Sequence, residues 1–250
     1  MSNIELFCGD CLEKMKNIPD NSIDLVLTDP PYGTTACKWD SIISFELMWK
    51  ELKRITKKNS PVLLFGQEPF SSYLRISNIE MFKYDWIWIK ERPTNVLQIK
   101  KRPGKNIESI SVFYNGQCLY YPQKFIHEGP LRTNKVKNGS LGILIDSKSK
   151  SVNEYRDDGT RYPLQTLNFK RDVLKSNLHP TQKPVELLEY LIKTYTNENE
   201  TVLDFTMGSG STGVAAKNLN RNFIGIELDK KYFEIAKKRI DESSNIVKNQ

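Results

Sequence analysis

The sequence predicts an α/β fold in which a mostly parallel sheet carries helices on both faces, a doubly wound arrangement. Short apolar segments alternate along the chain with amphipathic ones, which is typical of strands joined by crossover helices. A glycine-rich loop follows one of the last apolar segments and opens a helix. A long polar stretch without clear periodicity separates the two regular parts of the chain.

The first regular part is expected to hold strands and helices in alternation, followed by two strands in succession. The helical pattern is clearest in the segment 45–56, where Phe45, Met48, Trp49 and Leu52 share one face. Strands are expected at 4–10, 24–28, 61–66, 84–90 and 109–115, and helices at 11–18, 45–56 and 69–77.

The second regular part begins near residue 179 and is expected to open with a helix. Pro184 suits the first helical turn, and an apolar stripe follows it at Val185, Leu188, Leu191 and Ile192. A strand, the glycine loop, a helix and a strand that ends in an acid come next, and the segment 230–242 is a last amphipathic helix.

Composition divides the chain into segments 1–115, 116–178 and 179–250. The middle segment holds 11 Lys and Arg against 6 Asp and Glu, and it therefore carries most of the net charge of +7. Such composition suits either a solvated insertion or a functional insert that meets a polyanion.

No apolar run approaches the roughly 20 residues of a membrane helix, and no secretory signal is recognisable.

The cysteines do not predict a metal site. Cys8 and Cys11 have C-x-x-C spacing, but no second pair with ligand spacing accompanies them, and both histidines lie far away in the sequence. We therefore expect no metal and a reduced, cytosolic protein.

The glycine loop "DFTMGSGSTG" at 204–213 predicts a site for a nucleoside-containing cofactor. Gly208, Gly210 and Gly213 allow tight turns and the close approach of a ligand. Glu227 ends the following strand, 19 residues after Gly208, where a carboxylate can bind two ribose hydroxyls.

The loop does not by itself select one cofactor. It lacks the Gly-Lys-Ser/Thr ending of a phosphate loop. The run G-S-G-S-T-G at 208–213 matches the dinucleotide pattern, so a dinucleotide remains an alternative. Asp204, at the end of the preceding strand, suits a cationic group such as the methionine end of S-adenosylmethionine, which is the favoured ligand.

Three motifs together resemble one enzyme family. They are "DPPY" at 29–32, "HPTQKP" at 179–184 and the glycine loop at 204–213. In this order they are similar to the motifs of the DNA amino-methyltransferases, which methylate the exocyclic nitrogen of adenine or cytosine. The order matches the β class, whose Rossmann-like sheet is circularly permuted. The resemblance covers nearly the whole chain outside 116–178.

The resemblance implies a catalytic corner formed by Asp29, Pro30, Pro31 and Tyr32. An aromatic amine is a poor nucleophile, because its lone pair is delocalised into the ring. The Asp29 carboxylate and the Pro30 carbonyl would accept its hydrogen bonds and favour a more tetrahedral nitrogen. The prolines hold the carbonyl still, and the Tyr32 ring offers a stacking face to a flipped base.

The resemblance also assigns the neighbouring roles. Trp86 or Trp88 is a candidate for a second stacking aromatic, although such residues are more often core. His179 is expected to be structural, since the family needs no dedicated base. The expected contacts of S-adenosylmethionine are Asp10, Cys11, Asp29, Thr181, Lys183, Asp204, Phe205, Met207, Gly208, Ser209, Gly210, Ser211, Thr212, Glu227 and Leu228.

The family implies double-stranded DNA as the partner, with 1–115 as the catalytic half, 116–178 as the target-recognition insertion and 179–250 as the cofactor-binding half. An initial Asp in the corner is more usual of adenine enzymes than of cytosine enzymes. A homodimer, a cognate restriction endonuclease and a location in a prokaryotic or phage-infected cytoplasm, near the nucleoid, are further expectations. Cytosine-N4 methylation, methylation of RNA or protein amides, and a non-catalytic DNA-binding module are the alternatives.

Overall fold

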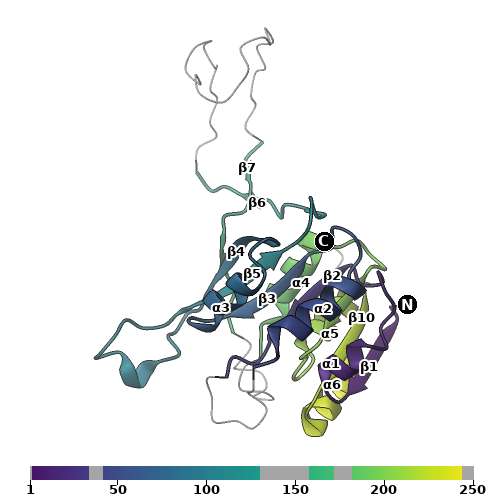
Figure 1. The fold of residues 1–250 in the computed structure, drawn as a ribbon. Helices are drawn as coiled ribbons and strands as arrows, with labels where there is room; N and C mark the ends of the chain where they lie inside the picture. Colours follow the sequence, from purple (N-terminus) through teal and green to yellow (C-terminus); the bar gives the residue numbers. More distant parts are fainter. Residues whose placement is uncertain (1, 34–41, 130–157, 172–181, 244–250) are drawn as a thin grey trace. The chain divides into compact units, whose positions relative to one another are not determined.

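A mixed eight-stranded sheet organises the computed structural model, which describes residues 2–33, 42–129, 158–171 and 182–243 (Figure 1). The strand order is β1-β10-β9-β2-β3-β5-β4-β8. The strands are β1 Ile4–Cys8, β2 Leu25–Thr28, β3 Val62–Gly66, β4 Phe82–Ile89, β5 Ile107–Phe113, β8 Thr166–Asn168, β9 Thr201–Asp204 and β10 Asn222–Glu227.

The helices lie at the sequence positions predicted for them. They are α1 Cys11–Met15, α2 Phe45–Ile55, α3 Phe70–Ser77, α4 Val185–Tyr195, α5 Ser211–Asn218 and α6 Lys230–Glu242, with a 3₁₀ turn η1 at Val96–Gln98. Side chains cap several of these helices. The carboxylate of Asp10, for example, accepts from the backbone N–H of Glu13 at 3.1 Å and so begins α1.

The sheet is mostly parallel, as the alternation of strands and helices predicted. β1, β10, β9, β2 and β3 run parallel to one another, and β8 is parallel to β4. Only β5, among the described strands of this sheet, is antiparallel to its neighbours, which are β3 and β4. The reversal follows from the direct succession of β4 and β5 without an intervening helix, since a chain that turns back without a crossover pairs antiparallel.

Alternating side chains of the strands pack into two cores, one on each face. Leu25 and Leu27 of β2 belong to a core with buried residues of α4, α5 and α6. Val26, between them in sequence, belongs to the other core, together with buried residues of α1, α2 and α3. Because successive strand residues point to opposite faces, both faces of the sheet are covered, and the fold is doubly wound.

The described chain divides into two compact units. One holds the eight-stranded sheet and spans 1–121 and 164–250, and the other spans 122–163. The second unit contains an antiparallel pair, β6 Phe125–Ile126 with β7 Thr160–Arg161, and the Lys124 ammonium lies 4.8 Å from the centre of the Tyr162 ring. The predicted insertion 116–178 is not confined to the second unit, because its strand β8 pairs with β4 and covers the edge of the main sheet.

No helix within the described ranges is long and apolar enough to cross a membrane.

Candidate active site

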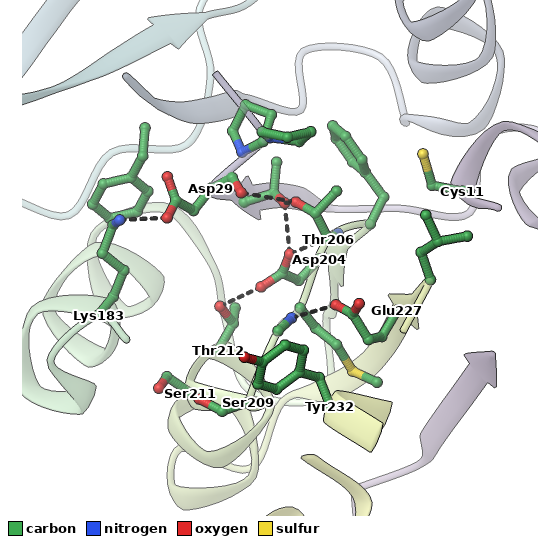
Figure 2. Close-up of a pocket in the computed structure, with 18 of the residues that line it drawn as sticks. Cys11, Asp29, Lys183, Asp204, Thr206, Ser209, Ser211, Thr212, Glu227 and Tyr232 are labelled. Carbon is green, nitrogen blue, oxygen red and sulfur yellow. Dashed lines mark hydrogen bonds and ion pairs between the residues drawn. The ribbon is translucent and has the colours of Figure 1, made fainter. Parts of the chain in front are cut away.

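A pocket lies where β1, β2, β9 and β10 end (Figure 2). These strands are parallel, so their carboxyl ends meet at one edge of the sheet, and the segments that follow them converge there. Because β2 pairs with β9, the corner that begins at Asp29 and the glycine loop that begins at Asp204 become neighbours.

The pocket gathers nearly all of the predicted site residues. It is lined by Asp10, Cys11, Asp29, Pro30, Pro31, Tyr32, Lys183, Asp204, Phe205, Met207, Gly208, Ser209, Ser211, Thr212, Glu227 and Leu228. Gly210 does not line it. Its backbone has a φ of +78°, and a Cβ there would lie 3.0 Å from the Cβ of Ala236, so this glycine lets α5 begin close against α6. Thr181 and His179 lie outside the described residues.

Three threonines fix the Asp204 carboxylate in the pocket wall. The hydroxyls of Thr28 and Thr212 donate to its two oxygens at 2.6 Å each, and the Thr206 N–H donates at 3.1 Å (Figure 2). Burial raises the pKa of Asp204 to about 6, against the lowering effect of these hydrogen bonds. A cation in the pocket would favour the ionised carboxylate, which fits the charge predicted for the methionine end of the cofactor.

Thr206 joins the two predicted motifs. Its hydroxyl donates to the backbone carbonyl of Asp29 at 3.1 Å and lies 2.6 Å from the Thr28 hydroxyl. Thr28 and Thr206 were not predicted as site residues. Two features of the sequence could have indicated them. Thr28 directly precedes the motif acid Asp29, and Thr206 lies within the glycine-loop motif, two residues after Asp204.

Glu227 is placed by the backbone around it. Its two carboxylate oxygens accept from the N–H groups of Gly208 and Asp229, at 2.8 Å each. Each oxygen retains a second lone pair, which fits an adjacent pair of ribose hydroxyls. Burial raises the pKa of Glu227. Arg239 of α6 donates to the Ser209 carbonyl at 3.0 Å and braces the loop from outside.

A buried set of four charges supports the catalytic corner. The Lys183 ammonium contacts the Asp29 carboxylate and lies 2.8 Å from that of Glu108. Lys90, at the end of β4, is 2.5 Å from the other oxygen of Glu108. The Tyr32 hydroxyl donates to Asp29 and also lies 3.3 Å from Glu108. Two carboxylates thus balance two ammonium groups.

These contacts determine the direction of each pKa. Burial raises the pKa of Asp29, the Lys183 ammonium opposes this, and the Glu108 carboxylate adds to it. Burial acts upward on Glu108 as well, but Lys183 and Lys90 outweigh it and hold its pKa at about 2. Burial also raises the pKa of Tyr32. The phenol is therefore neutral, so its hydroxyl donates to the carboxylates beside it and its ring is free to stack.

Glu108 and Lys90 were not anticipated, because a charged residue in a strand usually faces solvent. Glu108 is instead only 3% exposed, and its main partner, Lys183, is distant in the sequence. The resemblance assigned Lys183 to the methionine end of the cofactor. In the structure its ammonium lies against Asp29 and Glu108, within the pocket wall.

Neither Trp86 nor Trp88 lines the pocket, and the structure places both in the core. Both rings are buried. The Trp86 indole N–H donates to the Tyr195 hydroxyl at 2.8 Å, and that of Trp88 donates to the Phe169 carbonyl at 2.9 Å. Among the described residues, Phe70 packs beside Tyr32, with the two ring centres 4.9 Å apart.

The cysteine in the pocket is not a nucleophile. Burial raises the pKa of the Cys11 thiol to about 12, so it is neutral and unreactive at ordinary pH. Across the described segments, no group of three or more His, Cys, Asp or Glu side chains is placed to hold a metal ion.

Comparison with protein families matches residues 23–238 to the N6/N4 DNA methylase model. The type II methyltransferase M.HinfI of Haemophilus influenzae is 31% identical over 94% of this chain and 67% of its own length. The DNA adenine methyltransferase YhdJ of Escherichia coli (strain K12) is 27% identical over 95% of this chain and 82% of its own.

Solved structures agree with this match. The complex of M1.HpyAVI with S-adenosylmethionine has a TM-score of 0.61 at 30% identity and covers 94% of this chain and 99% of its own. The PvuII cytosine-N4-specific methyltransferase has a TM-score of 0.67 at 18% identity, with 99% and 89% covered, and shares the fold. The chain therefore belongs to the N6/N4 family of S-adenosylmethionine-dependent DNA methyltransferases.

Proposed function

We propose that the protein methylates the exocyclic N6 amine of adenine in duplex DNA, with the target base flipped out of the helix. The observation that carries the proposal is the catalytic corner. Asp29 and Tyr32 line the same pocket as Asp204 and Glu227, so an amine held at the corner lies beside the cofactor site.

The corner supplies hydrogen-bond acceptors for the amine. The Asp29 side chain and the Pro30 carbonyl are fixed in advance, the first by Lys183 and Tyr32 and the second by the two prolines. Acceptors of this kind favour a tetrahedral nitrogen and stabilise the positive charge that develops on it. Asp29 or water then takes the proton from the methylated amine. Tyr32 offers its ring to the flipped base.

The residues around the loop would hold the cofactor. Glu227 suits the ribose hydroxyls, Asp204 suits the cationic methionine end, and Asp10 suits the adenine amino group. S-adenosylmethionine supplies an activated methyl group on a sulfonium when it is bound. The backbone of the loop is open to it because Gly208 has no side chain.

The choice of adenine rests on the acid that begins the corner, and one experiment tests it. The purified protein is incubated with unmethylated DNA and S-adenosylmethionine labelled in the methyl group, and the DNA is digested to nucleosides. We expect the label in N6-methyl-2′-deoxyadenosine. Label in N4-methyl-2′-deoxycytidine would overturn the adenine assignment, and label found only in RNA or protein added as competitor would overturn DNA as the substrate.

The same proposal includes target recognition by the segment 116–178, whose basic excess suits phosphates and whose polar side chains suit base edges. It extends to a homodimer, a restriction endonuclease partner and a location with the nucleoid in a prokaryotic cytoplasm. Sequencing of the methylated sites in a host that expresses the protein would give the recognition sequence. Methylation scattered over unrelated sequences would contradict site-specific action.

A further inference from the structure

A basic arm, residues 91–106, joins β4 to β5 and extends away from the sheet as the teal segment at the left of Figure 1. Its tip is η1, where Leu97 is fully exposed and Val96 is 63% exposed. Neighbouring exposed apolar side chains at a protruding tip form a contiguous apolar surface, which is the kind of surface that contacts with another molecule bury.

Internal hydrogen bonds hold the basic arm in shape. The Thr94 N–H donates to the Lys105 carbonyl at 2.9 Å, and the Asn95 side chain donates to the Pro103 carbonyl at 3.0 Å. The Gln98 N–H donates to the Asn95 carbonyl at 2.8 Å and closes the turn that carries Leu97. The arm is therefore a compact surface loop with close ends, which presents its apolar tip in a fixed direction.

The arm is strongly cationic. Its only acid is Glu91, and its basic residues are Arg92, Lys100, Lys101, Arg102 and Lys105. Burial lowers the pKa of Lys105, and the positive charges of Lys90 and Arg102 add to the effect. Within the described residues no acid forms an ion pair with Lys100 or Lys101. A polyanion that brings phosphates to this loop would relieve the repulsion among these charges.

The base of the arm is fixed to the catalytic corner. The Lys90 N–H donates to the Asn106 carbonyl at 2.7 Å, and the Lys90 ammonium contacts Glu108 at 2.5 Å. Glu108 in turn contacts Lys183 and Tyr32 in the pocket wall. Half of the arm, fully extended from its base, spans at most about 25 Å. This reach exceeds the roughly 12 Å width of a DNA major groove.

From these observations we infer that the basic arm binds the DNA duplex next to the target base. Its lysines and arginines hold phosphates, and Leu97 enters the groove and the stack where the extruded base has left a gap. Apolar side chains inserted between bases are a general means of stabilising a distorted duplex. The step that involves Leu97 rests on the base flipping of the proposed function, whereas the phosphate contacts do not.

Duplex DNA fits the arm better than a second copy of the chain does. The apolar tip alone would suit either, but a second copy carries a net charge of +7 as well as the same basic arm. Like charges brought together at an interface oppose association.

The test compares two arm variants with two matched controls. Leu97→Ala removes the apolar tip. Its control is Ile79→Ala, which removes another exposed apolar side chain, 62% exposed and just before the start of β4, at the end of the strand opposite to the arm. Lys100→Ala/Lys101→Ala removes two adjacent charges, and its control is Lys237→Ala/Lys238→Ala on α6. For each, DNA affinity is measured over a range of salt concentrations without cofactor, and methylation is measured on two duplexes. One duplex is fully paired, and the other has an abasic site opposite the target base.

We expect Lys100→Ala/Lys101→Ala to reduce the slope of log affinity against log salt by about 1.8, from two lost phosphate contacts. We expect Leu97→Ala to lower kcat/KM roughly tenfold on the paired duplex and to regain it on the abasic one, whose target base is already loosened. Both controls should behave as the unchanged protein.

An unchanged salt slope would overturn the phosphate contacts, and an equal loss by Leu97→Ala on both duplexes would overturn groove entry. A shift in sedimentation coefficient with unchanged DNA affinity would assign the arm to contacts between copies and overturn the inference as a whole. The salt slope involves no methyl transfer, so a failure of the adenine assignment leaves it intact.

Discussion

The Asp29 side chain is held by two donors at once, Lys183 on one oxygen and Tyr32 on the other. An amine that approaches this carboxylate must share an oxygen with one of them. Glu108 lies within 3.3 Å of the Tyr32 hydroxyl and 2.8 Å of the Lys183 ammonium. Glu108 is therefore placed to accept a hydrogen bond from whichever of these two donors the amine displaces from Asp29.

Asp29→Ala should abolish methyl transfer, with a loss of at least about a thousandfold in kcat, while the dissociation constant of S-adenosylmethionine changes little. The acceptor is lost, but the glycine loop, Asp204 and Glu227 remain. Calorimetry gives the affinity and the labelled assay gives the rate. Asp85→Ala, which removes an acid paired with Arg75 outside the pocket, is the control. A fully active Asp29→Ala would show that the proposed mechanism is wrong.

Glu108→Gln should destabilise the protein by about 3–5 kcal/mol, because it leaves two buried ammonium groups with one carboxylate. Lys90→Met/Glu108→Gln restores the charge balance and should regain most of that stability. Urea unfolding of the single and double variants measures the coupling between the two sites. If the double variant were no more stable than Glu108→Gln, the two charges would not depend on each other.

The raised pKa of Asp204 makes a pH-dependent prediction. The pKa of Asp204 is about 6 in the folded protein and 3.8 in an unfolded chain, so the folded protein binds the proton of this carboxyl group more tightly. The carboxyl therefore weakens the fold progressively as pH rises from about 4 to about 6, by at most about 3 kcal/mol. Asp204→Asn should raise the unfolding temperature at pH 7.5 without cofactor and leave it unchanged near pH 4.

The same carboxyl should make cofactor binding depend on pH. Binding of the cationic methionine end requires the ionised form, so the affinity of the unchanged protein should fall below about pH 6, and Asp204→Asn should bind weakly throughout. Calorimetry at several pH values measures this. A flat profile between pH 5 and pH 7.5 would remove Asp204 from cofactor binding.

At the scale of elements, the packing of α5 against α6 depends on glycine. A Cβ on Gly213 would lie 2.4 Å from Cδ1 of Ile240 and 2.7 Å from a ring carbon of Phe223. α5 begins at the cofactor loop, so this close approach of the helices also sets the position of the loop.

Gly213→Ala should therefore cost about 1–3 kcal/mol of stability through overpacking, and it should weaken cofactor binding as α5 shifts. Ile240→Val removes the nearest atom. The pair Gly213→Ala/Ile240→Val should cost less than the sum of the single changes, as measured by urea unfolding. Additive costs would show that the two side chains do not meet.

Local pattern was enough to predict most elements of the fold. Strands such as β3, with its buried run Val62–Gly66, and helices such as α2 carry their period in their own residues. The place of β5 between β3 and β4 depends on strand pairing, which no local period encodes. The basic arm was missed for a related reason, because its polar and apolar residues have neither helical nor strand period.

The predictability of the site follows the same division. Asp29, Asp204 and Glu227 stand in motifs at strand ends and were predicted. Glu108 and Lys90 have no motif, and they join the site through contacts with Lys183 and Tyr32, which the fold brings from other parts of the chain. Burial of a charge is a tertiary property, so the sequence alone does not reveal it.

At the scale of the whole molecule, the two compact units predict separable functions. Replacement of 122–163 by a short Gly-Ser linker should leave the unfolding temperature and its rise on addition of S-adenosylmethionine nearly unchanged, because the strands and helices around the pocket lie in the other unit. Site-specific methylation of DNA should be lost. Retention of the same methylated sequence would move target recognition out of this unit.

The sheet order also has a consequence for the growing polypeptide. β1 pairs with β10 alone within the described sheet, and β2 needs β9 on one side, so strands made first wait for strands made last. Until β9 and β10 have left the ribosome, the acceptor corner has no loop beside it and the sheet has open edges. Incomplete chains are therefore inactive toward the genome, and the open edges make them substrates for chaperones and proteases.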